Sequence, residues 1–218
     1  MERSIATKLN KFFATSAPTR FKKGDMIIRA QDPLFSIHYI KEGYVRQFVY
    51  SENGDDVTIN IFKPKSFFPI AAALSGAQNS FNFQAMTDTT SYRKSPDEVI
   101  RFLKKEHDVL FDLTKRLSSG LLGLAVRIGA SPFEPAYKKL SLILLYFAKH
   151  FGEQHPDKTD GKIMIKIPLT HGEVGGWIGV ARETASRQFE KLSKKGIITY
   201  THTKITINDL SALEKETK

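Results

Sequence analysis

Residues 169–192 read LTHGEVGGWIGVARETASRQFEKL, and the structure expected for this stretch guides the interpretation of the whole chain. Thr170 followed three residues later by Glu173 is a capping box, which predicts that a helix begins at the next residue, His171. Gly179 ends that helix after two turns, and a second helix is expected over 181–195. Two short helices joined by a glycine-containing turn are typical of a helix-turn-helix.

The start of the second helix carries side chains suited to reading DNA bases. Arg182, Glu183 and Arg187 fall in its first two turns, the part that enters a major groove. Arginine can bond guanine O6 and N7 in a bidentate fork, and glutamate can accept a hydrogen bond from cytosine N4. Because Glu183 and Arg187 are i,i+4 neighbours, a surface ion pair of about 0.3–0.5 kcal/mol is the alternative interpretation.

The surroundings of these three residues favour DNA recognition. Residues 197–200 and 204–207 predict the two strands of a wing after the second helix. The N-terminus of the first helix is suited to an anion, and a lysine further along the second helix positions the DNA backbone rather than specifying sequence. The side chains expected to contact phosphate are Thr170, His171, Ser186 and Lys191.

The charge of the chain is concentrated in the same region. Lys and Arg number 33 against 23 Asp and Glu in 218 residues, a net charge of +10. Residues 162–204 hold eight of the cations and three Glu, so half the excess lies in a fifth of the chain. Such a patch indicates an anionic partner, although a solvated basic surface would have the same composition. Because Cys is absent, disulfides, cysteine-ligated zinc and thiolate-bound iron–sulfur clusters are excluded.

The N-terminal half is rich in predicted strands. From Phe21 to about Tyr92, short β-prone segments alternate with turn signals at roughly ten-residue spacing, which suggests a small antiparallel barrel or sandwich. A hairpin is expected from 44–50 and 57–62 around Asn53-Gly54. In its second strand, Val57, Ile59 and Ile61 alternate with polar residues, the pattern of a half-buried strand.

Helices are expected on both sides of a proline-rich hinge. A short helix begins near Pro96, a long one follows over 108–131, and another is expected over 136–151. The prolines in 130–135 interrupt the helical pattern and make this segment the best hinge candidate. The long helix has apolar residues three or four apart, which favours a two-stranded dimer helix, although packing against its own domain would need the same stripe. The predicted dimer residues are Leu110, Leu113, Leu117, Leu121, Leu124 and Ile128.

Residues 179–187, GVARETASR, closely resemble the Gly-x-Ser-Arg-Glu-Thr-x-x-Arg segment of the cyclic-AMP receptor protein and FNR (Crp-Fnr) family of bacterial transcription regulators. Residues 21–25, 39–46 and 65–68 are similar to the β-roll landmarks of that family. The resemblance implies a homodimer, and it implies that Arg182, Glu183 and Arg187 contact an inverted repeat of TGTGA-like half-sites.

The expected fold class is therefore α+β. We predict an N-terminal helix and an antiparallel β-roll like a cyclic-nucleotide-binding domain over 1–107, a dimerisation helix over 108–131 and a winged helix-turn-helix over 132–218. No catalytic motif, metal-ligand cluster or membrane-spanning segment is recognisable, so we expect neither an enzyme nor a metal protein. The expected partners are double-stranded DNA, a second copy of the chain and RNA polymerase, in the cytoplasm and with no membrane.

The sensor region departs from the family pattern. Family members that bind cyclic nucleotide carry Gly-Glu and then Arg-Ser or Arg-Thr, where this chain has Pro69-Ile70 and Asn79-Ser80. Loss of the arginine would leave a buried phosphate unpaired, so we expect no cyclic nucleotide. His38 is the only histidine of the roll and the only candidate haem ligand, and a lone histidine is more often structural.

The roll is instead rich in aromatic residues. Either they fill the barrel or they line a pocket for an unknown apolar effector. The pocket candidates are Phe48, Phe62, Phe68, Phe81 and Phe83. Two other functions stay open: a small-ligand or cyclic-nucleotide sensor that acts through protein partners, and a winged helix that binds RNA, which the acidic Glu183 makes less attractive.

Overall fold

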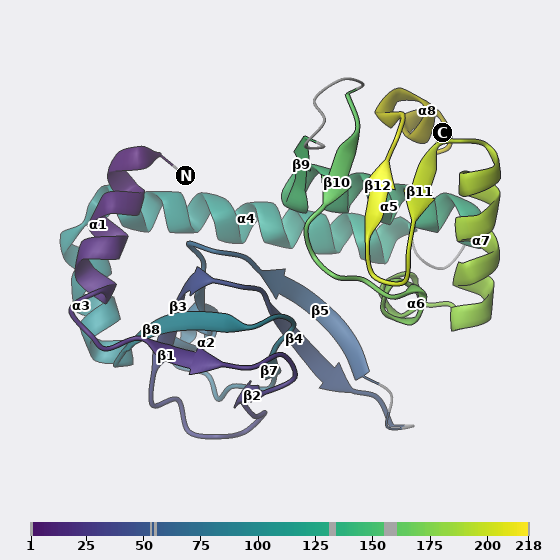
Figure 1. The fold of residues 1–218 in the computed structure, drawn as a ribbon. Coiled ribbons are helices and arrows are strands. Elements are labelled where there is room, and N and C mark those ends of the chain that lie inside the picture. The colour runs from purple at the N-terminus through teal and green to yellow at the C-terminus, as the bar shows by residue number, and fades with distance from the viewer. Residues whose placement is uncertain (1, 53, 55, 131–133, 155–160, 218) are drawn as a thin grey trace. The chain divides into compact units, whose positions relative to one another are not determined.

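The computed structural model describes residues 2–52, 54, 56–130, 134–154 and 161–217, without side chains for 126–130. The chain folds as two compact units, Met1–Ala125 and Val126–Lys218 (Figure 1). The boundary falls inside helix α4 (His107–Ala130), so the predicted dimerisation segment is shared between the units. Helices and antiparallel sheets occur in both units, and the predicted α+β class is confirmed.

Unit 1 is built on two four-stranded sheets whose strands all pair antiparallel, with orders β1-β8-β3-β6 and β2-β7-β4-β5. The strands are β1 (Thr19–Phe21), β2 (Met26–Ile28), β3 (Ile37–Glu42), β4 (Val45–Tyr50), β5 (Asp56–Phe62), β6 (Phe67–Phe68), β7 (Asn82–Ala85) and β8 (Thr89–Lys94). The strand-rich region is therefore as predicted, and β4 pairs with β5 as the predicted hairpin.

The alternation expected in β5 is wrong in part. Thr58 and Ile61 are the buried residues of this strand, whereas Val57 and Ile59 are half-buried. The cause is a register shift between β4 and β5, where Gln47 pairs with Asn60 but the next residue pairs with Thr58. The extra residue, Ile59, makes a bulge that reverses which side chains face inward.

The helices of unit 1 close a hydrophobic core against the first sheet. They are α1 (Arg3–Phe13), α2 (Ile70–Ser75), α3 (Pro96–Lys105) and the first half of α4. Leu9 and Phe13 of α1 pack with Tyr39 of β3, Leu103 of α3 and Leu113 of α4. Helix α2 was not predicted because a six-residue helix is too short to show a 3.6-residue period.

Unit 2 places three helices and a fourth short one against a four-stranded sheet of order β11-β12-β10-β9 (Figure 1). The helices are α5 (Ala136–Phe151), α6 (His171–Ile178), α7 (Arg182–Lys194) and α8 (Leu210–Lys215), and the strands are β9 (Gly152–Gln154), β10 (Ile163–Ile165), β11 (Ile198–Tyr200) and β12 (Ile205–Ile207). The predicted helix-turn-helix and both wing strands are confirmed. Strand β9 was not predicted, and its residues pair with β10 at one edge of the sheet.

Candidate nucleic-acid interface

The first helix of the helix-turn-helix begins with the predicted capping box. The Thr170 hydroxyl accepts a hydrogen bond from the Glu173 backbone N–H at 3.2 Å, and Glu173 Oε2 accepts from the Thr170 N–H at 2.7 Å. The hydroxyl also donates to the same carboxylate oxygen at 2.8 Å. Because the N–H and the hydroxyl of Thr170 are both bonded within the cap, Thr170 fixes the residue at which α6 begins. This structural role is separate from its predicted contact with phosphate.

The turn between α6 and α7 depends on two glycines. Gly179 adopts a left-handed conformation with φ +67°, which a residue with a side chain rarely adopts. At Gly175 a Cβ atom would lie 2.8 Å from the Val180 carbonyl oxygen and 3.5 Å from the Ala185 Cβ. Small residues at these positions let the turn and α7 approach α6 closely, and so set the orientation of α7 within unit 2.

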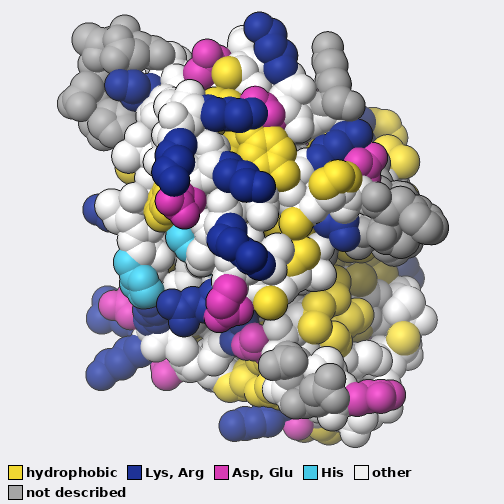
Figure 2. Space-filling model, turned by 90° about the vertical axis from the view of Figure 1, so that its right-hand side faces the viewer, with side chains coloured by type: hydrophobic (Ala, Val, Ile, Leu, Met, Phe, Trp, Pro, Cys, Tyr) yellow, Lys and Arg dark blue, Asp and Glu magenta, His cyan; other side chains and the backbone are white. Residues whose placement is uncertain are grey.

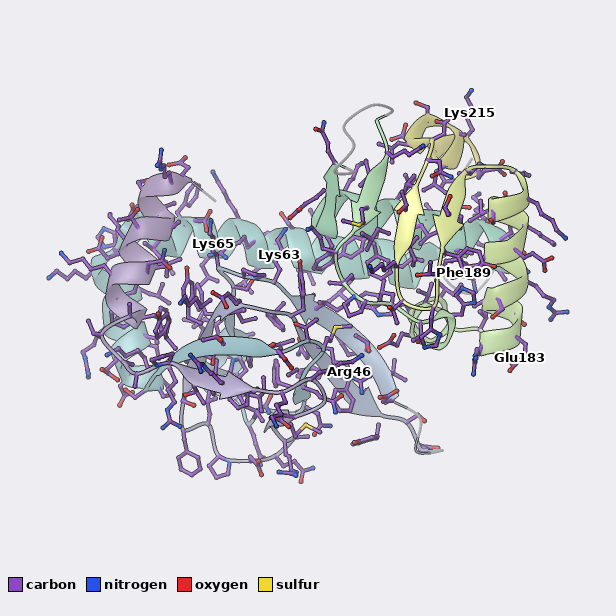
Figure 3. All side chains as sticks on the ribbon, in the orientation of Figure 1. Arg46, Lys63, Lys65, Glu183, Phe189 and Lys215 are labelled. Carbon is purple, nitrogen blue, oxygen red and sulfur yellow. The ribbon has the colours of Figure 1, made fainter. Side chains whose placement is uncertain are left out.

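Helix α7 presents its predicted base-reading residues to solvent. Ala185, Phe189 and Leu192 are fully buried and anchor the helix, whereas Arg182, Glu183, Arg187 and Lys191 are exposed. Figure 3 shows Glu183 at the free N-terminal end of α7 and Phe189 directed into unit 2. Arg187 donates a hydrogen bond from Nη2 to Thr184 Oγ1 at 3.3 Å. Lys and Arg side chains gather over this face, with histidines among them (Figure 2).

Two of the predicted phosphate contacts, His171 and Ser186, are bonded to each other. His171 Nδ1 and Ser186 Oγ are hydrogen-bonded at 2.9 Å, which joins the start of α6 to α7. The His171 ring is stacked on Phe189 with 4.2 Å between centroids, and Tyr200 of β11 meets it edge-on at 4.8 Å. His171 is thus held in place by both helices and by the wing.

A hollow of about 300 Å³ lies beside these residues in unit 2. Thr170, His171 and Gly172 line it from α6, Arg182 from α7, and Tyr200, Thr201 and His202 from the wing. Tyr200 and His202 were not predicted as site residues. Tyr200 ends the first predicted wing strand and His202 lies between the two strands, which was the available signal.

In unit 1, the predicted pocket residues lie in a packed core. Phe48, Phe68 and Phe83 are each at most 1% exposed, whereas Phe62 and Phe81 are half-buried. Phe68 stacks on Phe83 with 5.1 Å between ring centroids. These contacts favour the interpretation that the aromatic residues fill the roll.

The residues at the family's cyclic-nucleotide positions do not fit that ligand. Ile70, where the family has glutamate, is buried in the core with Phe13 and Phe67. Asn79, where the family has arginine, is 2% exposed, and its amide bonds the backbone carbonyls of Arg29 and Phe81. Neither side chain supplies a carboxylate for a ribose hydroxyl or a cation for a phosphate.

The predicted dimer residues of α4 fall into different environments. Leu113 is 4% exposed in the core of unit 1, and Leu110 packs against that core. The prediction that both lie on a free surface is therefore wrong. The periodic stripe identified an apolar face but not which part of the protein covers it. Leu117 and Leu121 are exposed, Leu124 is half-buried, and the side chain of Ile128 lies outside the described residues.

Among the described residues, no group of three or more His, Asp or Glu side chains is placed to hold a metal ion. In the same part of the chain, no helix combines the length and apolar character needed to cross a bilayer.

Comparison with known proteins gives matches to both units. The profile described as Crp-like helix-turn-helix domain matches residues 138–216, and that described as Cyclic nucleotide-binding domain matches 18–106. A global nitrogen regulator of Synechocystis is 25% identical over 198 residues, covering 90% of this chain and 86% of its own length. The transcriptional regulator SdrP of Thermus thermophilus is 27% identical over 199 residues, covering 89% and 91%.

Solved structures share the fold across most of the chain. FixK2 from Bradyrhizobium japonicum aligns with a TM-score of 0.78 at 16% identity, covering 93% of this chain and 98% of FixK2. A CRP/FNR-family transcriptional regulator from Thermus thermophilus aligns at 0.69 and 23% identity, covering 92% and 98%. With the helix-turn-helix, its wing and the N-terminal roll in their expected order, the chain belongs to the Crp-Fnr family of bacterial transcription regulators.

Proposed function

We propose that this protein is a homodimeric transcription regulator that reads an inverted repeat of TGTGA-like half-sites through α7. The observation that carries the proposal is the exposure of Arg182, Glu183 and Arg187 on the first two turns of a helix whose opposite face is fully buried. Such a helix can enter a major groove without unfolding any part of unit 2. The role is one of binding rather than catalysis, with RNA polymerase as the protein partner and the bacterial cytoplasm as the place of action.

Operator selection from random DNA duplexes tests the proposal, followed by substitution of a base-reading residue. Arg187→Ala is expected to cost about 1–3 kcal/mol on the selected operator and little on random DNA. Lys215→Ala is a matched control, because Lys215 is an exposed cation on α8, far from Glu183 in Figure 3. Equal losses of Arg187→Ala on operator and random DNA would reject base reading at this position.

The dimer is proposed to form along the exposed face of α4. Phe111, Leu121 and Leu122 are more than 60% exposed, an unusual state for large apolar side chains. Phe111, Ser118 and Ala125 are exposed and seven residues apart, the spacing of one seam in a two-stranded coiled coil. This face replaces the predicted stripe that began at Leu110 and Leu113. Two such helices side by side would bring the recognition helices of both protomers to one operator.

We further propose that no cyclic nucleotide or iron–sulfur cluster controls this regulator. The buried Ile70 and the hydrogen-bonded Asn79 support the first part, and the absence of Cys supports the second. Calorimetry with cyclic AMP and cyclic GMP should detect no binding at micromolar concentration. Binding in that range would instead support a cyclic-nucleotide sensor.

A further inference from the structure

The hollow beside the helix-turn-helix is lined mainly by hydrogen-bond donors. Arg182, Tyr200 and His202 reach it from α7 and the wing. Across residues 134–154 and 161–217, no protein group forms a hydrogen bond or ion pair with any of these three side chains. The backbone N–H groups of His171 and Gly172, at the first two positions of α6, are also among the groups that a helix leaves without an intrahelical acceptor.

His171 is the titratable group held most firmly at this hollow. Its Nδ1 atom is bonded to Ser186 and its ring lies against Phe189 and Tyr200. Within the described part of unit 2, Nε2 has no protein partner. The nearby Glu173 carboxylate is engaged by the Thr170 N–H and hydroxyl, so it is already committed to the capping box.

Several groups that can donate hydrogen bonds converge here, and none of the residues that line the hollow is a carboxylate. Such a lining suits a ligand that offers several anionic oxygens. Resting on the DNA-binding function proposed above, we propose that this hollow binds one backbone phosphate of the operator and that His171 takes up a proton as the phosphate enters. The affinity for DNA is then coupled to pH through a residue of the interface itself.

The charges around His171 set the direction of this coupling. Burial lowers the pKa of His171 below its usual 6.5, and the electrostatic effect of the nearby Arg182 and His202 lowers it further. A phosphate in the hollow counteracts that repulsion and raises the pKa. The complex therefore binds more protons than the free protein, and affinity rises as pH falls. The gain ends below the pKa of the free protein, where His171 is protonated in both states.

Operator affinity measured between pH 5.5 and 8.0 at constant ionic strength tests the inference. The wild-type protein should bind more tightly as pH falls, by up to about tenfold per pH unit for each His171 that takes up a proton. His171→Gln should lose this slope, whatever its affinity at pH 8, and His107→Gln should keep it, because His107 is exposed on α4 in unit 1. A wild-type affinity independent of pH would overturn the inference and leave the DNA-binding function intact. Absence of specific binding at every pH would reject the function itself.

A second measurement removes the charge of single phosphates in the operator. Methylphosphonate, which carries no charge, replaces the phosphate at one position of both half-sites at a time, with the wild-type protein as reference. One position in each half-site should abolish the pH slope, and combining it with His171→Gln should have no further effect. If no position does so, or if His202→Gln rather than His171→Gln removes the slope, the assignment is wrong.

Inorganic phosphate distinguishes a DNA phosphate from a free anion. The imidazole of His171 is followed by NMR with and without the operator. The operator should raise the pKa of His171, and millimolar inorganic phosphate at the same ionic strength should not. An equal rise with inorganic phosphate would identify a free-anion site and reject the DNA backbone as its ligand.

Discussion

At the scale of single residues, His38 shows how a candidate ligand can be a structural residue. It is 5% exposed, with Nε2 hydrogen-bonded to Ser36 Oγ and Nδ1 to Ser91 Oγ, both at 3.1 Å. Its ring stacks on Phe68 with 5.4 Å between centroids. Because both nitrogens are occupied within unit 1, these contacts support a structural role over haem ligation.

The burial of His38 predicts a pH-dependent stability. Burial and the nearby charge of Arg93 lower its pKa to about 4. Between pH 6.5 and 4 the unfolded chain binds a proton that the folded protein does not, so stability falls with pH by about 3 kcal/mol from this residue. His38→Gln should show a smaller loss than wild type when urea denaturation is measured from pH 7.5 to 4.5. Equal losses would mean that His38 titrates normally.

Arg182 is both a predicted base contact and one of the residues that line the hollow. Because it lines the hollow, Arg182→Ala should lose a phosphate contact in addition to any base contact. We expect it to weaken both operator and random DNA and to reduce the dependence of log Kd on log salt concentration by about one. Arg187→Ala should leave this salt dependence unchanged, and filter-binding titrations from 50 to 300 mM salt compare the two. Identical salt dependences would show that Arg182 contacts no phosphate.

At the scale of elements, the protein has two helices that begin with the same kind of capping box, so one can serve as a control for the other. Ser95 and Glu98 cap α3 in unit 1 as Thr170 and Glu173 cap α6 in unit 2. Thr170→Ala and Ser95→Ala should each cost about 1 kcal/mol of stability in chemical denaturation, because each leaves a helix N–H without its acceptor. Only Thr170→Ala should also weaken operator binding, and Thr170→Ser should restore both properties. If Ser95→Ala weakened binding equally, the effect would be one of general stability.

Helix α4 carries residues that stabilise the protomer and other residues that are proposed to form the dimer. Leu113 is buried in the core of unit 1, so Leu113→Ala should cost about 2–5 kcal/mol in chemical denaturation. Leu121 is 68% exposed, and Leu121→Ala should change the stability of a protomer little in a dilute, monomeric sample. A large loss for Leu121→Ala under those conditions would place it in the core of the protomer.

At the scale of the whole molecule, the proposed dimer is tested by charging its seam. Leu121→Glu puts two carboxylates in an apolar contact, and sedimentation at micromolar concentration should show a shift from dimer to monomer. Operator affinity should fall with it, because two linked recognition helices bind one inverted repeat better than one. Lys104→Glu on α3 is an exposed control and should stay dimeric. A wild-type protein that is monomeric at micromolar concentration and binds operator tightly would contradict the dimer.

Sequence patterns predicted an element correctly where interactions between neighbouring residues determine its structure. The Thr170–Glu173 box, Gly179 and the charged start of α7 act over a few residues. They predicted the start and end of α6 and placed α7 to within one residue at each end. Helix α5 was predicted over 136–151 as observed, because its apolar period and the preceding prolines are both local. The short helix α2 and the edge strand β9 were missed because neither has a period long enough to recognise.

The amino-acid sequence by itself determined the family, the helix-turn-helix and the residues exposed on α7, because caps, turns and periodicity are encoded within short segments. Only the tertiary structure decided that Leu113 belongs to the core of its own unit, that Ile59 bulges, and that His171, Arg182 and His202 share one hollow. These properties depend on contacts between segments distant in the chain. A hydrophobic or charged pattern indicates which face is buried or charged, and the folded chain alone decides what lies against it.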